Sequence, residues 1–140
     1  MYQNQMNELL QAAQAGDENK LRSLLATNPE LANMENAEGL TPLGYAAHYG
    51  HPNAVKTLLE HGVEVNAISH SKVSYIPSNT ALHAGIAGGC SIEVIKLLLE
   101  CGAKTDILDS NGYTPIEVAA SHKSSKEIIE LLEEYNSRGA

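Results

Sequence analysis

The sequence predicts an all-α solenoid of four stacked repeats, each built from two helices. The first observation is a recurring motif, most complete at residues 40–51 (LTPLGYAAHYGH), which returns in part at 9–16, 80–83 and 113–120. The second is a Leu-Leu pair that follows each copy, at 24–25, 58–59, 98–99 and 131–132. Two linked motifs that recur together indicate repeats, and such units bury their apolar faces only by stacking.

The second copy shows how the first helix of a repeat is specified. The Thr41 hydroxyl can cap free amides at a helix N-terminus, and Pro42 suits the first turn, where its missing N–H costs nothing. Ala46 and Ala47 give a small-residue surface that a neighbouring helix can approach closely. Gly50 suits a left-handed helix end. We therefore expect a short helix between Thr41 and Gly50.

The second helix of the same repeat follows directly. Val55, Leu58 and Leu59 fall on one apolar stripe at helical spacing. Gly62 is placed to end this helix, and residues 63–66 lead into a turn. Each repeat is thus predicted to be a helix, a tight turn, a second helix and a projecting hairpin-like loop, called a finger below.

The terminal repeats differ from the central ones in polarity. The first has Asn7-Glu8-Leu9 where Thr-Pro-Leu would stand, which fits a polar N-terminal cap. The last helix carries a charged face suited to the other end of the stack. Its residues are Lys126, Glu127, Glu130, Glu133 and Glu134.

The third repeat is longer than the others. Thr41 and Thr80 are 39 residues apart, whereas Thr80 and Thr114 are 34 apart, so about five extra residues lie between Asn66 and Thr80. One more residue enters the turn at 87–90. Insertions of this kind fall in connections, where repeat proteins tolerate them. The second finger should therefore be elongated.

The segments GLTPLGYAAHYGH, VKTLLEHGVEVNA and NGYTPIEVAA resemble ankyrin repeats, and the resemblance covers about residues 5–135. It implies one ankyrin-repeat domain over 1–140, with repeats at about 5–36, 37–69, 70–108 and 109–136. It also implies a non-catalytic protein-binding module that needs no cofactor. A G-x-S-x-G nucleophile elbow is absent, and the glycine-rich 85–89 lacks the Lys-Ser/Thr of a phosphate loop.

Composition narrows the class of partner. A net charge of −8 argues against nucleic-acid or membrane binding and mildly favours a protein partner with a basic surface. The N-terminus lacks the basic and apolar regions of a signal peptide, and two cysteines are too few for a disulfide framework. We expect a cytoplasmic protein that is monomeric in isolation.

The histidines suggest an alternative function. His48 and His51 have H-x-x-H spacing and His61 follows, so a metal or small-molecule site is conceivable there, with Cys90 as a redox-sensitive neighbour. The resemblance instead makes His51 a framework residue. It likewise makes His83 a framework residue that hydrogen-bonds across repeats.

Two further sets of residues receive structural or positional assignments. Cys90 and Cys101 are both expected to be buried or half-buried small hydrophobes. His48 and His122 are assigned to the same slot of two repeats. The framework does not explain that slot.

The partner-binding residues implied by the resemblance lie on the fingers and at the inner-helix ends. They are Leu40, His48, Tyr49, Ile68, Tyr75, Ile76, Pro77, Asn79, Leu108, Asn111, Tyr113 and His122. Large apolar side chains at such positions, tyrosine above all, serve as rigid anchors. Two further possibilities are an accessory or inhibitory subunit of one dedicated enzyme and a regulatory module joined to a larger chain.

Overall fold

The computed structural model describes residues 2–73, 78–88, 91–122 and 126–138, and every regular element within them is a helix. The inner helices are α1 (Tyr2–Ala15), α3 (Pro42–His48), α5 (Ala81–Ala87) and α7 (Pro115–Ser121). The outer helices are α2 (Glu18–Thr27), α4 (Pro52–Glu60), α6 (Ile92–Glu100) and α8 (Lys126–Arg138). A 3₁₀ helix, η1 (Pro29–Asn33), follows α2. The predicted all-α class is confirmed.

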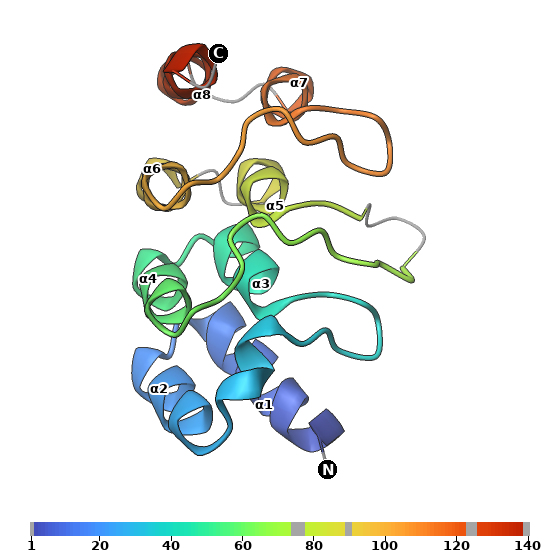
Figure 1. Ribbon diagram of the computed structural model, residues 1–140, viewed down its shortest axis with the longest axis vertical. Helices are drawn as coiled ribbons and strands as arrows, with labels where there is room; N and C mark the ends of the chain where they lie inside the picture. Colours follow the sequence, from blue (N-terminus) through green and yellow to red (C-terminus); the bar gives the residue numbers. More distant parts are fainter. Residues whose placement is uncertain (1, 74–77, 89–90, 123–125, 139–140) are drawn as a thin grey trace.

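The helices form two layers (Figure 1). α2, α4, α6 and α8 stack in one column and α1, α3, α5 and α7 in the other, with the chain termini at opposite ends of the stack. Each inner helix packs on the next inner helix, and each outer helix on the next outer one. The fingers project on the side of the inner helices. This is the predicted solenoid of helix pairs.

The helix ends follow the local chemistry that the sequence predicts. The Thr41 side chain accepts a hydrogen bond from the Gly44 N–H, and Thr80 and Thr114 cap α5 and α7 in the same way. Gly50 has a positive φ of 73°, as expected of a residue that ends a helix in the left-handed region. These caps fix where each inner helix begins and ends.

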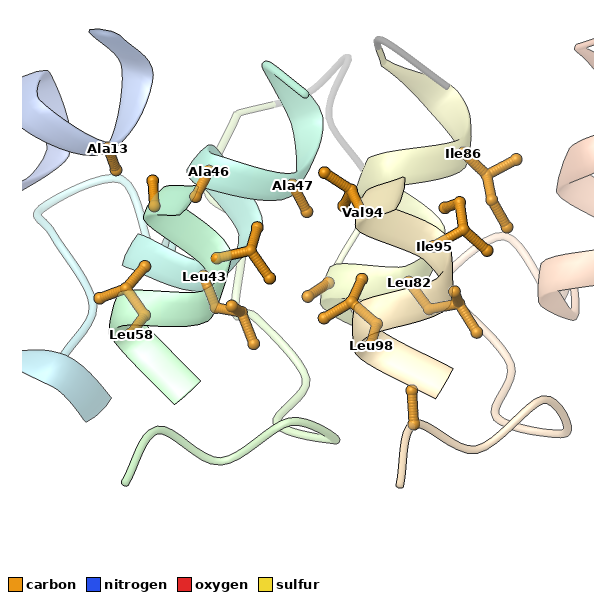
Figure 2. Packing of buried hydrophobic residues seen from close by; sticks show 14 of the residues in the cluster. Ala13, Leu43, Ala46, Ala47, Leu58, Leu82, Ile86, Val94, Ile95 and Leu98 are labelled. Carbon is orange, nitrogen blue, oxygen red and sulfur yellow. The ribbon is translucent and has the colours of Figure 1, made fainter. Parts of the chain in front are cut away.

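The core runs between the layers and is aliphatic (Figure 2). Ala46 and Ala47 are fully buried between α1 and α5, and a Cβ added at Gly85 would lie 3.5 Å from the Ala47 Cβ. Small side chains thus allow the inner helices to approach closely. The Val55 and Leu58 stripe of α4 is also fully buried.

Asparagine side chains link consecutive repeats behind the fingers. Asn66 donates from Nδ2 to the Gly102 carbonyl at 3.0 Å and accepts the Lys104 N–H at 2.8 Å. Asn33, one repeat earlier, makes the same pair of bonds to Gly62 and Glu64. These bonds fix the register of neighbouring repeats.

Backbone hydrogen bonds also join the fingers, which comprise residues 34–41, 62–80 and 102–114. In the second finger, the His70 N–H donates to the Gly39 carbonyl at 3.0 Å. Its other arm accepts at the Ser78 carbonyl from the Ser110 N–H, at 2.9 Å. The elongated second finger is therefore anchored to both neighbours. Its residues 74–77 lie outside the described part of the chain.

The two ends of the stack differ from the central repeats. α1 has 14 residues and extends back to Tyr2, whereas α3, α5 and α7 have seven each. No Thr-Pro pair starts α1, so the helix continues further toward the N-terminus. The five charged residues predicted for the α8 face are all exposed.

The expectation for Cys101 was wrong. Cys101 is the C-cap of α6 and is exposed, because the chain turns away from the core at this position. Cys90 lies outside the described residues. Among the described helices, none is both long and apolar enough to cross a membrane.

Candidate partner-binding groove

A groove of about 680 Å³ opens between the fingers and the inner helices of the last three repeats. Its floor comes from α3, α5 and α7, and its far wall from the three fingers. The lining residues are Glu38, Leu40, Thr41, Gly44, Tyr45, His48, Tyr49, Ser69, Asn79, His83, Ala84, Ala87, Asp109, Asn111, Tyr113, Val118, Ser121 and His122. It lies between the fingers and the inner-helix ends, where the sequence analysis expected a partner to bind.

The floor is lowest at α5, because that helix carries small residues where its neighbours carry larger ones. Three positions of each of the inner helices α3, α5 and α7, counted from its capping threonine, face the groove or end the helix, and each position has an equivalent residue in all three. They are Tyr45, Ala84 and Val118; His48, Ala87 and Ser121; and the C-caps Tyr49, Gly88 and His122. A hollow at Ala84 and Ala87 therefore lies between the aromatic side chains of α3 and the end of α7.

This register corrects one assignment. His48 is the last residue of α3, whereas His122 is the C-cap of α7 and is equivalent to Tyr49. The two histidines therefore do not share a slot. Both line the groove and both are exposed.

Gly88 allows α5 to end close to α3. A Cβ added at Gly88 would lie 2.1 Å from the His48 carbonyl oxygen, a distance that no side chain can occupy. Glycine is thus required by the approach of the two helix ends. This contact fixes the position of His48 at the rim of the hollow.

The aromatic rim of the groove is arranged before any partner arrives. The Tyr49 ring packs against the His48 ring edge to face, with centroids 5.0 Å apart, and lies 6.1 Å from the Tyr45 ring. Tyr49 is nevertheless 45% exposed, and Tyr113 on the opposite wall is 46% exposed. Both rings offer apolar surface, and the contacts with neighbouring rings already restrict the rotamer of Tyr49.

Most of the residues predicted to bind a partner come together here. Seven line the groove: Leu40, His48, Tyr49, Asn79, Asn111, Tyr113 and His122. Leu40, however, is only 9% exposed, so the expectation of an exposed finger contact was wrong for it. Tyr113, which stands at the equivalent position just before the capping Thr114, is 46% exposed. Ile68 and Leu108 are exposed, at 44% and 55%, but lie outside the groove. Tyr75, Ile76 and Pro77 lie outside the described residues.

His83 is buried beneath the groove and joins two repeats, as predicted. Its Nε2 lies 2.9 Å from the Tyr113 carbonyl oxygen and must carry the proton, because a carbonyl only accepts. Nδ1 then accepts from the Thr80 hydroxyl at 2.7 Å. Burial lowers the pKa of His83 below its ordinary value, against the opposing influence of the Tyr113 carbonyl and Asp109. The imidazole is therefore a neutral structural link.

Asp109 is a groove residue that the sequence analysis missed. It lies in the third finger, is 8% exposed, and accepts the Asn111 and Tyr113 N–H groups on one oxygen, Oδ1, at 2.9 Å each. Asn36 closes the first finger with the same two bonds. The signal was present in the sequence, since both residues stand five before a capping threonine.

The metal alternative is not supported by the geometry of the histidines. His51 Nε2 bonds the Gln14 carbonyl at 2.7 Å, and His61 Nδ1 bonds the Thr57 carbonyl at 2.8 Å. Each ring is thus tied to a different backbone group. Within the part of the chain that the structure describes, no three His, Cys, Asp or Glu side chains gather as a metal site requires. The alternative of a metal site at His48, His51 and His61 is therefore not borne out by the described residues.

The charges in the groove lining are of one sign. Glu38 and Asp109 are the acidic residues among the described lining, and none of the described lining residues is Lys or Arg. The histidines His48, His83 and His122 supply the remaining titratable groups apart from the tyrosines. The groove is therefore electrostatically suited to a cationic ligand.

Comparison with known proteins agrees with this architecture. A family model described as "Ankyrin repeats (3 copies)" matches residues 2–69, and one described as "Ankyrin repeats (many copies)" matches residues 45–99. Chicken Inversin is 33% identical over 126 residues, which are 90% of this chain and 11% of that protein. The rice protein named "Probable E3 ubiquitin-protein ligase XBOS32" is 35% identical over 131 residues, 91% of this chain and 25% of its own length.

A third relative shows the same pattern of partial coverage. The mouse protein named "Protein fem-1 homolog A-like" is 36% identical over 99 residues, 71% of this chain and 14% of its own length. The chain thus spans about a tenth to a quarter of these relatives. The two family models, the capped helix pairs and the stacked layers all agree, and the chain belongs to the ankyrin repeat family.

Proposed function

We propose that this protein is a non-catalytic interaction module that binds another protein in the groove between its fingers and inner helices. The observation that carries the proposal is the groove itself, which is open across three repeats and rimmed by the exposed rings of Tyr49 and Tyr113. Half-exposed aromatic side chains on a rigid surface are typical interface anchors. Ankyrin repeats are in general protein–protein interaction modules.

The framework supports this role because it fixes the groove before binding. His83, the Asn66 bridge and the bonds between fingers hold neighbouring repeats in one register. A surface that is already ordered loses little conformational entropy when a partner binds. The exposed Ile68 and Leu108 would extend the contact beyond the groove, onto the fingers.

The test combines affinity capture with variants of matched exposure. Tyr49→Ala and Tyr113→Ala should reduce capture of the partner, which mass spectrometry identifies with the wild-type protein as bait. Both should keep the wild-type melting temperature, because neither ring is buried. Glu93→Ala, on the exposed face of the outer helix α6, is the control and should capture normally.

The outcome is decided with the purified partner. If both tyrosine variants bind it with wild-type affinity, the groove is not the interface. Ile68→Ala and Leu108→Ala then measure how far the contact reaches along the fingers. Weaker binding by either one would place the partner beyond the groove.

A further inference from the structure

The Asp109 carboxylate has one oxygen engaged in the fold and one that is not. Oδ1 accepts hydrogen bonds from the backbone N–H groups of Asn111 and Tyr113 in the third finger. Among the described residues, no hydrogen bond or ion pair reaches the other oxygen, Oδ2. Every fully enclosed side-chain nitrogen or oxygen of the described residues has a partner, so this oxygen is not sealed in the core. Asp109 lines the groove although the residue is only 8% exposed.

A carboxylate in this position lacks a compensating charge. Of the described groove residues none is Lys or Arg, and Glu38 adds a second negative charge. His83, on which Asp109 acts electrostatically, is buried and already joins Thr80 to the Tyr113 carbonyl. Removing a carboxylate from water is costly unless a cation or further donors meet it. A ligand that brings a cation to Asp109 would supply the positive charge that the groove lining lacks.

The shape of the groove indicates what presents the cation. The groove runs over three repeats, and its hollow is floored by Ala84 and Ala87, where an inserted side chain has room. Tyr113 lies in the same finger as Asp109 and leaves 46% of its surface exposed. A tyrosine ring and a carboxylate that line the same groove favour a guanidinium or ammonium group. An extended segment with a long cationic side chain fits these features.

We propose that the groove binds an extended basic segment of the protein partner, and that an arginine or lysine side chain of this segment pairs with Asp109. This inference rests on the proposed function and names the chemistry that the groove recognises. A neutral or acidic segment would leave the carboxylate desolvated and unpaired, so it should bind less tightly.

The chain itself supplies the design of the decisive variant. Asn36 closes the first finger through the same two backbone bonds that Asp109 makes in the third. Asp109→Asn should therefore keep the finger closed while it removes the negative charge. Glu93→Gln removes one charge from the exposed face of α6, outside the groove, and is the matched control.

The probes are short synthetic peptides of random sequence, with Arg, Lys, Gln or Glu fixed at the centre. Peptides enriched on the immobilised wild-type chain are labelled with fluorescein, and their Kd is measured by anisotropy. Arg- and Lys-centred peptides should be enriched, and Asp109→Asn should weaken their binding about tenfold or more. The Glu93→Gln variant should bind them as the wild type does.

Four results would overturn the inference. Equal enrichment of Gln- or Glu-centred peptides would show that the groove does not recognise a cationic side chain. Equal weakening by Asp109→Asn and Glu93→Gln would show attraction to the overall charge. If Tyr49→Ala abolishes peptide binding but Asp109→Asn leaves it intact, the inference is refuted, while the proposed function still stands. Binding of no peptide would refute recognition of an extended segment, while capture of a folded partner remains a separate test.

Discussion

Replacing His83 with alanine should destabilise the protein more than any other histidine substitution. The side chain is 1% exposed and makes hydrogen bonds to the Thr80 hydroxyl and the Tyr113 carbonyl. Two such bonds contribute about 2 kcal/mol together. The cavity left by the imidazole adds about 1–2 kcal/mol. The expected loss in the free energy of unfolding is therefore about 3–4 kcal/mol.

The assay is urea unfolding followed by circular dichroism at pH 7.5, with His122→Ala as the control. His122 is exposed, so its removal should change the free energy of unfolding by less than about 0.5 kcal/mol. The loss at His83 corresponds to a drop of about 10 °C in Tm for a chain of this size. A His83→Ala variant within about 0.5 kcal/mol of the wild type would refute the structural role.

The same residue should make stability depend on pH. Burial lowers the pKa of His83 in the folded state, whereas the unfolded value is about 6.5. Between these two values the unfolded chain binds more protons, so acid favours unfolding. The stabilisation is complete above about pH 6.5 and is lost as the pH falls through the folded-state pKa.

The slope separates this effect from general acid denaturation. From pH 7.5 to 5, the urea midpoint of the wild type should fall more steeply than that of His83→Gln, which cannot titrate. Parallel slopes for the wild type and His83→Gln would contradict a neutral buried imidazole.

Two further substitutions test the contacts between repeats by thermal unfolding. Gly88→Ala should destabilise by about 2 kcal/mol or more, since its Cβ would overlap the His48 carbonyl. Gly62→Ala, which meets no atom within 4 Å but has a positive φ of 80°, should cost about 1 kcal/mol; equal losses would contradict the packing argument. Asn66→Ala should cost about 1–3 kcal/mol through its two bonds to the next repeat, whereas the exposed Asn53→Ala should cost almost nothing. An unchanged Tm for Asn66→Ala would rule out that bridge.

The architecture was predictable because its determinants are local and repeated. Thr41 caps the helix that the sequence assigned to it, and Ala46 and Ala47 pack between inner helices as their size requires. Each such feature depends on neighbours a few residues away, or on the equivalent position of the next repeat. The family resemblance adds to this because it comes from the same framework residues. His83 is the clearest example, since its bond across repeats was expected and is present.

The groove was less predictable because it depends on which side chains face each other across repeats. Leu40 was expected at an exposed position but is buried, whereas Tyr113 at the equivalent position of the third finger is exposed. His48 and His122 were assigned to one slot, and the helix ends show that they occupy two. Asp109 was overlooked because a turn-forming Asp is unremarkable in sequence. Its unbonded oxygen follows only from the three-dimensional arrangement.

Two positions at which one repeat differs from its neighbours lie in the same groove. The framework requires a capping threonine and a small buried side chain between the inner helices, which Thr41 with Ala46, Thr80 with Gly85 and Thr114 with Ala119 supply. It does not require Ala84 where the neighbouring repeats have Tyr45 and Val118, nor a carboxylate where Asn36 serves equally well. Both departures line the same groove. Both departures therefore act on the groove, where α5 presents the small side chain of Ala84 and the third finger presents the carboxylate of Asp109.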